Sequence, residues 1–452
     1  MSYKLKSPVF DLILCISDAV DSISPQLADH HRRTAYLAYQ LGRQFGLPVA
    51  RCKELAIAAA LHDIGATALK ERLNLLNFDT KVSADHNAVY AAHNAVYATH
   101  NEVSAVHAEV GYLLISNYPA FALAAEIVRF HHVNWNDGAG KLNMGLSVPV
   151  ESHILHLAER VAVQIDPRKE VLSQVRSITN RVKRKSGDDF MPEVVDAFLR
   201  LAEKDFIWFD MVSPSADIAL WNDLDWDVIS LEGAEFLELS RFFCRLVDFK
   251  SPFTATHSSR VAVCGQALAE LSGFSMLDQR LISLCGYLHD IGKLCVPLEI
   301  LDKPAALSTE ESAVMRHHAY YTNHILKRIG VFENVRVWSS YHHERLDGSG
   351  YPYQLKGEEL TTGSRIIAIA DVFTAVSEDR PYRSARNDID VMDVMNDMAR
   401  KGLLDARLIK LLGSRVHEIN ALMAEAEFSA SRDYQEFIDR RTRYMDFVRA
   451  GE

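Results

Sequence analysis

Apolar residues recur at helical spacing along most of the chain, and alternating patterns typical of strands are scarce. Residues 257–274 and 370–383 show the helical pattern clearly, because their apolar positions return about every three or four residues. Short turns rich in Gly, Pro and Asp, such as residues 347–352, separate these segments. The pattern predicts an all-α fold.

The pattern also repeats, because five blocks of the first half recur in the same order in the second half. The paired positions are His30 with His257, His62 with His289, His131 with His342, Glu159 with Asp371, and the segment near residue 190 with that near residue 403. This order indicates a tandem duplication. We therefore predict a first domain at residues 8–214, a linker at 215–234, a second domain at 235–430 and a C-terminal helix at 431–452.

The first two pairs lie 227 residues apart and the next two 211 or 212 apart, so the first half carries an insertion. Within it, histidines recur every seven residues, at His86, His93, His100 and His107. Positions seven apart share a helix face, so they could form a histidine stripe. The alternative, which we prefer, is a slipped duplication that lengthened one helix and leaves only His107 with a chemical role.

The net charge and the cysteine content limit the kinds of partner and the compartment that we expect for this protein. The formal net charge of −11 argues against broad binding to DNA, RNA or anionic membranes. An anionic small substrate stays possible, because bound metal ions can reverse the sign of a pocket. The six cysteines form no CxxC pair, and no long uncharged apolar stretch or signal peptide is visible. We expect a cytoplasmic protein with reduced cysteines.

The second half holds a dense set of residues that can bind metal. These candidate ligands are His257, His289, Asp290, His318, His342, His343 and Asp371. Each would be unremarkable alone, but their joint recurrence in order favours a metal centre. Mixed nitrogen and oxygen donors suit first-row metals such as iron or manganese. Two such ions could hold a bridging hydroxide for in-line attack on phosphorus, which needs no side-chain nucleophile.

Three motifs in this half resemble those of the HD-GYP phosphodiesterases, a branch of the HD superfamily. They are YLHDIGK at 287–293, HHERLDGSGYP at 342–352 and RIIAIADVFTAVSEDRPYR at 365–383. The resemblance implies a helical HD-superfamily domain in the second half, and with the internal repeat it predicts two such domains in tandem. It also implies a centre of two or three metal ions, often iron or manganese. Members hydrolyse cyclic di-GMP to linear pGpG and sometimes to GMP, and some with two HD-type halves resemble enzymes that cleave 3′3′-cyclic GMP-AMP.

The resemblance also suggests roles for individual residues. Asp290 would be a catalytic metal ligand, and Lys293 would be catalytic and contact the scissile phosphate. Further substrate contacts would come from Arg380, Arg383, Tyr351 and Gly350. Members with three ions carry Glu four residues before the first ligand histidine, whereas this chain has Phe253 there. We therefore expect two divalent ions, iron or manganese.

The first half retains a nearly complete counterpart of the ligand set. Its candidate ligands are His30, His62, Asp63, His107, His131, His132 and Glu159. Ala66 replaces the phosphate lysine, Val133 replaces Glu344, and no GYP sequence follows. We interpret this half as a degenerate HD domain, a possible second metal site, with a role in regulation, dimerisation or the substrate cleft.

These observations predict a metal-dependent phosphodiesterase that hydrolyses a guanine-containing cyclic dinucleotide, with cyclic di-GMP slightly ahead of 3′3′-cyclic GMP-AMP. A broader HD phosphohydrolase acting on nucleotides or RNA ends is a second hypothesis. A metal-binding signalling scaffold without turnover is a third hypothesis, of a different class. We expect no DNA or membrane partner, and a homodimer or a signalling-protein partner stays open.

Overall fold

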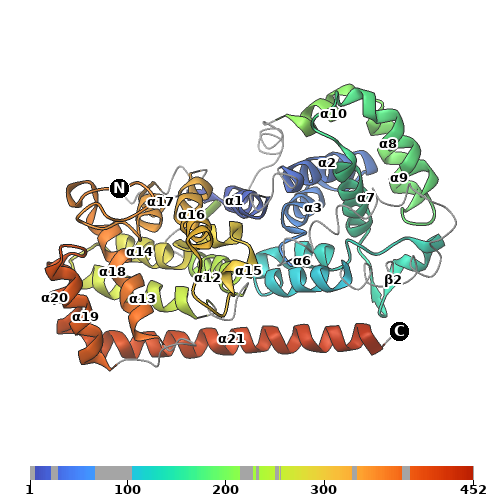
Figure 1. Ribbon diagram of the computed structural model, residues 1–452. Helices are drawn as coiled ribbons and strands as arrows, with labels where there is room; N and C mark the ends of the chain where they lie inside the picture. Colours follow the sequence, from blue (N-terminus) through green and yellow to red (C-terminus); the bar gives the residue numbers. More distant parts are fainter. Residues whose placement is uncertain are drawn as a thin grey trace. The chain divides into compact units, whose positions relative to one another are not determined.

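The computed structural model describes residues 6–21, 29–66, 104–213, 228–230, 234–249, 254, 256–327, 333–378 and 387–450. Within these ranges nearly all regular structure is helical (Figure 1), and the strands form two short two-stranded sheets, β1 with β4 and β2 with β3. The predicted all-α fold is therefore confirmed. Six residues named above lie outside the described ranges, and they are His86, His93, His100, Phe253, Arg380 and Arg383.

The chain divides into two compact units. The C-terminal unit comprises residues 1–15 and 228–438, and the N-terminal unit comprises residues 16–227 and 439–452. Helices α1 (Val9–Asp21) and α21 (Val416–Ala450) each contribute residues to both units. The domain boundaries predicted from the sequence stay a prediction.

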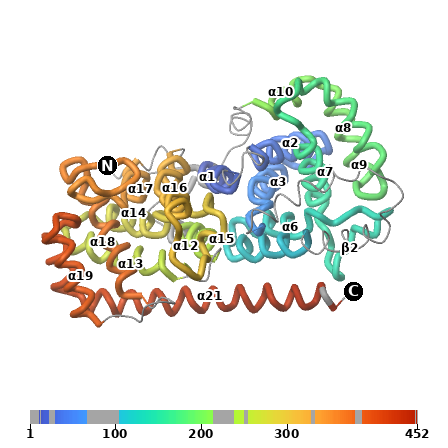
Figure 2. The backbone as a smooth tube through the Cα atoms, in the orientation of Figure 1, coloured from blue at the N-terminus to red at the C-terminus, as the bar shows by residue number. Residues whose placement is uncertain are grey.

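The C-terminal unit is built around α13, which packs against α14 and α18 (Figure 2). In the same unit, α16 packs against α17 and against the short helix η3. The elements of this unit are β1 (Lys6–Pro8), β4 (Val228–Ser230), α12 (Ala234–Asp248), α13 (His257–Leu271), α14 (Met276–Leu288), η3 (Ile291–Cys295), α15 (Leu298–Leu301), α16 (Thr309–Leu326), α17 (Glu333–Ser340), η5 (Gly357–Glu359), α18 (Thr362–Ser377), α19 (Asp388–Arg400) and α20 (Ala406–Ser414).

The N-terminal unit repeats this plan, with α2 packed against α3, α7 and α9. Its elements are α2 (His30–Phe45), α3 (Val49–Leu61), a helix at 104–115, η1 (Pro119–Phe121), α6 (Ala122–Arg129), η2 (Asn136–Lys141), β2 (Leu142–Asn143), β3 (Leu146–Ser147), α7 (Val150–Gln164), α8 (Leu172–Arg184), α9 (Pro192–Ala202) and α10 (Asp205–Val212). Thus α2, α3 and α7 stand where α13, α14 and α18 stand in the other unit.

The capping residues explain where several helices of the C-terminal unit begin. Ser308 and Glu311 form a reciprocal capping box at the start of α16. Thr361 accepts a hydrogen bond from the backbone N–H of Ser364 at the start of α18. These caps fix the first turns of two helices that carry candidate ligands.

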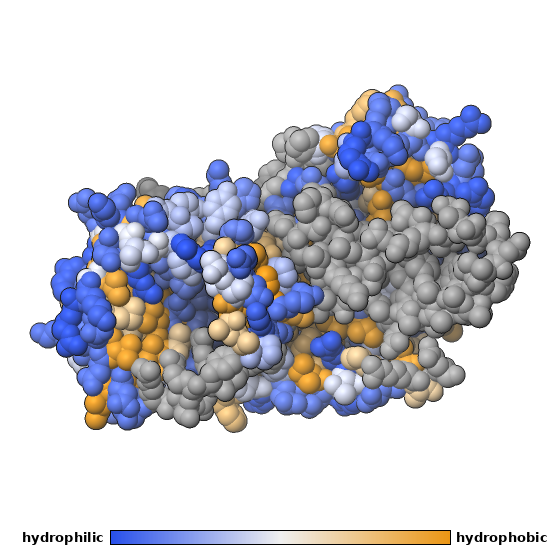
Figure 3. Space-filling view, in the orientation of Figure 1, coloured by the Kyte–Doolittle hydropathy of each residue, from blue (hydrophilic) through white to orange (hydrophobic). Residues whose placement is uncertain are grey.

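All six cysteines lie in the described residues, where they are buried and form no disulfide bond. The described part of the surface in view is largely hydrophilic, with apolar side chains in small groups between the polar ones (Figure 3). Within the described residues, no helix combines the length and the apolar character needed to cross a bilayer.

Candidate metal centres

The C-terminal unit brings all seven predicted ligands together. They come from five places in the fold: the start of α13, the end of α14, α16, the turn after α17, and α18. Three overlapping groups have ligand atoms close enough to hold an ion: His257 with His289 and Asp371; His289 with Asp290 and His342; and His318 with His342 and His343. Six of the seven side chains are buried, and His343 is half-buried.

The distances define two adjacent positions. In the first, Asp371 Oδ1 lies 3.2 Å from Nε2 of His257 and 3.9 Å from Nε2 of His289. In the second, Asp290 Oδ1 lies 3.5 Å from Nε2 of His318 and 3.9 Å from Nε2 of His342. The other Asp290 oxygen, Oδ2, lies 3.2 Å from Nε2 of His289. Asp290 therefore faces both positions, as a bridging carboxylate would.

The backbone orients three of the imidazoles. The Nδ1 atoms of His289, His318 and His342 lie 2.8, 2.6 and 2.6 Å from the carbonyl oxygen three residues earlier. Since a carbonyl can only accept, each Nδ1 carries a proton and each neutral ring presents the lone pair of Nε2. This is the usual arrangement of metal-binding histidines.

These lone pairs converge, which tests whether the site suits a metal. Nε2 of His318 lies 3.2 Å from Nε2 of His342, although both Nδ1 atoms hold the ring protons. Nε2 of His289 is buried and makes no hydrogen bond with a described residue. Burial, and next the neighbouring His343, lower the pKa of His342 well below its ordinary value, so an extra proton is unfavourable there. A divalent cation satisfies all of these atoms, and the residues therefore fit a metal centre.

Glu378, which the sequence analysis missed, orients a fourth ligand histidine, His257. Its Oε1 lies 3.2 Å from Nδ1 of His257, whose Nε2 faces Asp371. Burial opposes charging of this ring, but the Glu378 and Asp371 carboxylates prevail and raise the pKa of His257 to about 10. A carboxylate on the far nitrogen fixes the ring and strengthens it as a metal ligand.

Close packing explains the glycine of the HDIG sequence. A Cβ on Gly292 would lie 2.0 Å from the carbonyl oxygen of His318, so α16 can approach only because this residue has no side chain. Thr322 on the same helix donates to the carbonyl of His289 at 2.9 Å and accepts from the Gly292 N–H at 3.1 Å. Packing of α16 here sets the place of His318 beside His289 and Asp290.

Polar and aromatic groups surround the C-terminal centre. Lys293 pairs with Asp290 through its Nζ atom. The Tyr351 ring lies 4.7 Å from the ring of His343, and the exposed guanidinium of Arg316 lies 4.6 Å above the Tyr351 ring. Among the described residues, Arg316 has no ion-pair partner. The sequence analysis did not single out Arg316.

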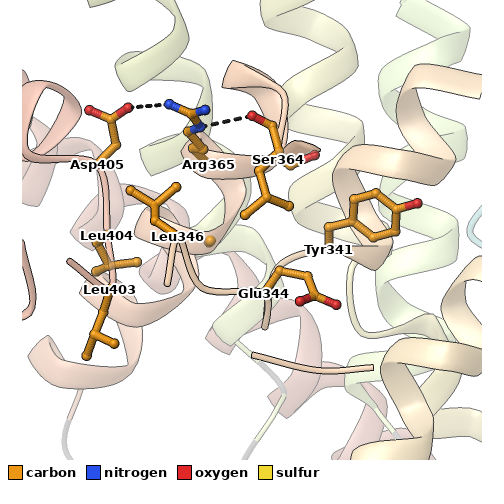
Figure 4. Close-up of a pocket in the computed structure, with 10 residues that line it drawn as sticks. Tyr341, Glu344, Leu346, Ser364, Arg365, Leu403, Leu404 and Asp405 are labelled. Carbon is orange, nitrogen blue, oxygen red and sulfur yellow. Dashed lines mark hydrogen bonds and ion pairs between the residues drawn. The ribbon is translucent and has the colours of Figure 1, made fainter. Parts of the chain in front are cut away.

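Glu344 and Arg365 hold the loop that contains the GYP sequence, residues 348–360, and stand outside the cluster. The Glu344 carboxylate accepts from the backbone N–H groups of Tyr353 and Leu355 at 2.7 and 3.0 Å. Arg365 donates to Asp405 at 2.9 Å and to the carbonyls of Leu360 and Gly357. Figure 4 shows Glu344, Arg365 and Asp405 around one small pocket, which none of the candidate ligands lines.

Gly350 in this loop also packs against backbone. A Cβ there would lie 2.5 Å from the Arg345 nitrogen and 2.6 Å from the His343 carbonyl oxygen. The first half has Val133 and His153 where the second has Glu344 and Arg365, and it has no GYP sequence. The loop and its supports are therefore missing together from the first half.

The N-terminal unit assembles a similar cluster. His30 with His62 and Asp63 forms one group, and His107 with His131 and His132 forms another. The Nδ1 atoms of His62 and His131 lie 2.8 and 2.6 Å from the carbonyl oxygen three residues earlier, as in the C-terminal unit. Nε2 of His30 lies 3.2 Å from Nε2 of His62, and Glu159 lies 3.9 Å from Nδ1 of His132.

One further pair of equivalent residues, which the sequence analysis did not name, stands out in the structure. Asp21 ends α1 and Asp248 ends α12, again 227 residues apart, and both are buried. Asp248 accepts from the hydroxyl of Ser258 at 2.7 Å, and Asp21 binds the ring of His31, the counterpart of Ser258. Burial raises the pKa of Asp248 to about 6. The duplication therefore extends upstream into α1 and α12.

Comparisons with known proteins agree with this geometry. Two family models match the chain, both described as HD domain, one over residues 27–164 and one over residues 241–408. The chain belongs to the HD-GYP phosphodiesterases, in the tandem arrangement with a degenerate first HD domain, and it is a hydrolase of phosphodiesters. The family and the enzyme class expected from the motifs are confirmed.

Two curated relatives and one solved structure are similar to this chain. The chain is 30% identical to the 3′3′-cGAMP-specific phosphodiesterase 1 of Vibrio cholerae, over 88% of this chain and 89% of that protein. It is 35% identical to a cyclic di-GMP phosphodiesterase response regulator of Xanthomonas campestris, over 34% of this chain and 41% of that protein. A crystal structure of a cyclic GMP-AMP phosphodiesterase of V. cholerae matches with a TM-score of 0.60 and 22% identity, covering 91% of this chain and 98% of that one. That structural match supports the fold.

Proposed function

We propose that the protein hydrolyses 3′3′-cyclic GMP-AMP at the C-terminal metal centre. The observation that carries this proposal is the extent of the similarity. The V. cholerae 3′3′-cGAMP-specific phosphodiesterase 1 matches along both halves, whereas the cyclic di-GMP phosphodiesterase of X. campestris matches about a third of the chain. The sequence analysis placed cyclic di-GMP slightly first, and the comparisons favour its alternative.

The C-terminal centre suits two ions, because Asp290 faces two groups of ligands. The first ion would be held by His257, His289 and Asp371 with Asp290, and the second by Asp290, His318, His342 and His343. Mixed imidazole and carboxylate donors favour iron or manganese. Divalent ions there would polarise the phosphodiester and offset the negative charge that develops on it.

Charged and aromatic side chains supply the rest of the site. Lys293 is held beside the centre by Asp290, where its ammonium group can exchange a carboxylate oxygen for a phosphate oxygen. The Arg316 guanidinium is exposed and lies over Tyr351, so its fork of donors can bind a second phosphate. A cyclic dinucleotide has two phosphates, which matches one cation at the centre and another beside it.

The test is a hydrolysis panel with the full-length protein. It compares kcat/KM for 3′3′-cyclic GMP-AMP, cyclic di-GMP and cyclic di-AMP, with Mn²⁺ and with Fe²⁺ under anaerobic conditions. We expect 3′3′-cyclic GMP-AMP to lead by at least about tenfold, because a site that hydrogen-bonds one base edge discriminates strongly against another. A higher kcat/KM for cyclic di-GMP would contradict the proposed substrate and favour cyclic di-GMP. Hydrolysis of none of the three would contradict the substrate class.

A further inference from the structure

The two metal clusters differ at a residue beside the last carboxylate ligand. In the C-terminal unit Val372 follows Asp371, and in the N-terminal unit Arg160 follows Glu159. The Arg160 side chain is largely buried, with 11% of its surface exposed. Its Nη2 lies 3.3 Å from Nδ1 of His132 and 4.0 Å from the Glu159 carboxylate. A fixed positive charge therefore lies within the N-terminal cluster.

The contact with Arg160 determines which nitrogen of His132 carries the proton. A guanidinium only donates, so Nδ1 of His132 must accept, and the neutral ring carries its proton on Nε2. That Nε2 lies 3.1 Å from Nε2 of His107 and can donate to it. Neither nitrogen of His132 then offers a lone pair to a metal.

His343, the counterpart of His132, has an equivalent carboxylate beside it but no guanidinium. Its Nδ1 lies 3.8 Å from the Asp371 carboxylate, much as Nδ1 of His132 lies 3.9 Å from Glu159, but Val372 stands in the place of Arg160. Because no guanidinium donates to its ring, His343 can present a nitrogen lone pair to a metal. The second ion position is therefore open in the C-terminal unit, whereas Arg160 closes it in the N-terminal unit.

Electrostatics works in the same direction. A divalent ion held by His107, His131 and His132 would stand one imidazole away from the guanidinium, and like charges this close repel strongly in a buried site. The first position is made by His30, His62 and Asp63, and Nε2 of His30 and Nε2 of His62 converge there at 3.2 Å. The ligands there fit a cation.

We propose that the N-terminal unit binds a single divalent ion, at His30, His62 and Asp63, and that the Arg160 guanidinium takes the place of the second. The unit also lacks the lysine that pairs with Asp290, because Ala66 stands there. A single ion in a closed cluster suits a structural role, and the two-ion chemistry belongs to the C-terminal unit. This inference does not depend on which cyclic dinucleotide is the substrate.

The test places at each of the two equivalent positions, 160 and 372, the residue that the other half carries there. Full-length wild type, Arg160→Val and Val372→Arg are loaded with Mn²⁺ and desalted, and the ions per chain are counted by elemental analysis. Arg160→Val should gain one ion and Val372→Arg should lose one. Asp63→Ala should also lose one, the ion of the N-terminal unit. Arg168→Val is the control, because Arg168 is exposed and pairs with Asp166, and its count should equal that of wild type.

Arg160→Met guards against misfolding, because it keeps an aliphatic stem in place of the arginine side chain. It should gain an ion as Arg160→Val does, with the helical circular dichroism of wild type. An unchanged count in both Arg160 variants, or an Asp63→Ala variant that holds as many ions as wild type, would overturn the proposal. A Val372→Arg variant that binds as many Mn²⁺ ions as wild type would contradict the claim that a guanidinium at this position excludes an ion.

Discussion

Replacing Glu378 by glutamine should weaken metal binding in the C-terminal unit without disturbing the fold. The carboxylate lies 3.2 Å from Nδ1 of His257, and the opposite ring nitrogen lies 3.2 Å from Asp371. Glutamine retains the shape but removes the charge that makes this imidazole a strong ligand. Loss of such an outer partner typically costs about 10- to 100-fold in metal affinity or activity. We therefore expect a loss of that size in Mn²⁺ affinity, about 1.4–2.7 kcal/mol.

The assay is a titration of apo protein with Mn²⁺, read by recovery of hydrolysis and by direct metal binding. Saturating Mn²⁺ should restore much of the rate of Glu378→Gln, because the residue acts on the metal centre through His257. Asp166→Asn is the control, since Asp166 is the counterpart of Glu378 by position and pairs with Arg168. Equal Mn²⁺ affinity in Glu378→Gln and wild type would refute the reasoning.

Three further substitutions test the surroundings of the centre. Lys293→Ala should lower kcat by about 10²–10³-fold with metal content unchanged, because it removes a charge facing the reacting phosphate; loss of metal would instead show a structural role. Arg316→Gln should raise KM for the cyclic dinucleotide by about 10-fold or more, the value of a charge-assisted hydrogen bond, with bis(p-nitrophenyl) phosphate hydrolysis unaffected; an unchanged KM would remove Arg316 from the site. Gly292→Ala should destabilise the unit by about 1–3 kcal/mol, because its Cβ would overlap the His318 carbonyl; an unchanged melting temperature would contradict this packing.

Much of the candidate site could be predicted because metal chemistry restricts residue types. His, Asp and Glu are the side chains that most often ligate iron or manganese, so their spacing and recurrence in both halves made the clusters visible in the sequence. The structure brings His257, His289 and Asp371 together from three separate helices. The all-α fold followed from the same repeated helical pattern.

The supporting residues were harder to predict, because their roles depend on where their side chains point in the folded protein. Glu378 is one of many acidic residues, and only the structure shows it on the ring of His257. The equivalence of Asp21 and Asp248 in the repeat could have been found by extending the 227-residue offset upstream. Arg160 could be aligned with Val372, but nothing in the sequence says that its guanidinium turns toward His132.

The division of labour between the halves is the central claim, and one measurement tests it most directly. Hydrolysis of 3′3′-cyclic GMP-AMP is compared in full-length Asp290→Ala and Asp63→Ala, which change the same HD position in the two units. Asp290→Ala should abolish turnover with helical content retained, and Asp63→Ala should keep measurable turnover. Turnover that survives in Asp290→Ala and disappears in folded Asp63→Ala would contradict the assignment of catalysis to the C-terminal centre.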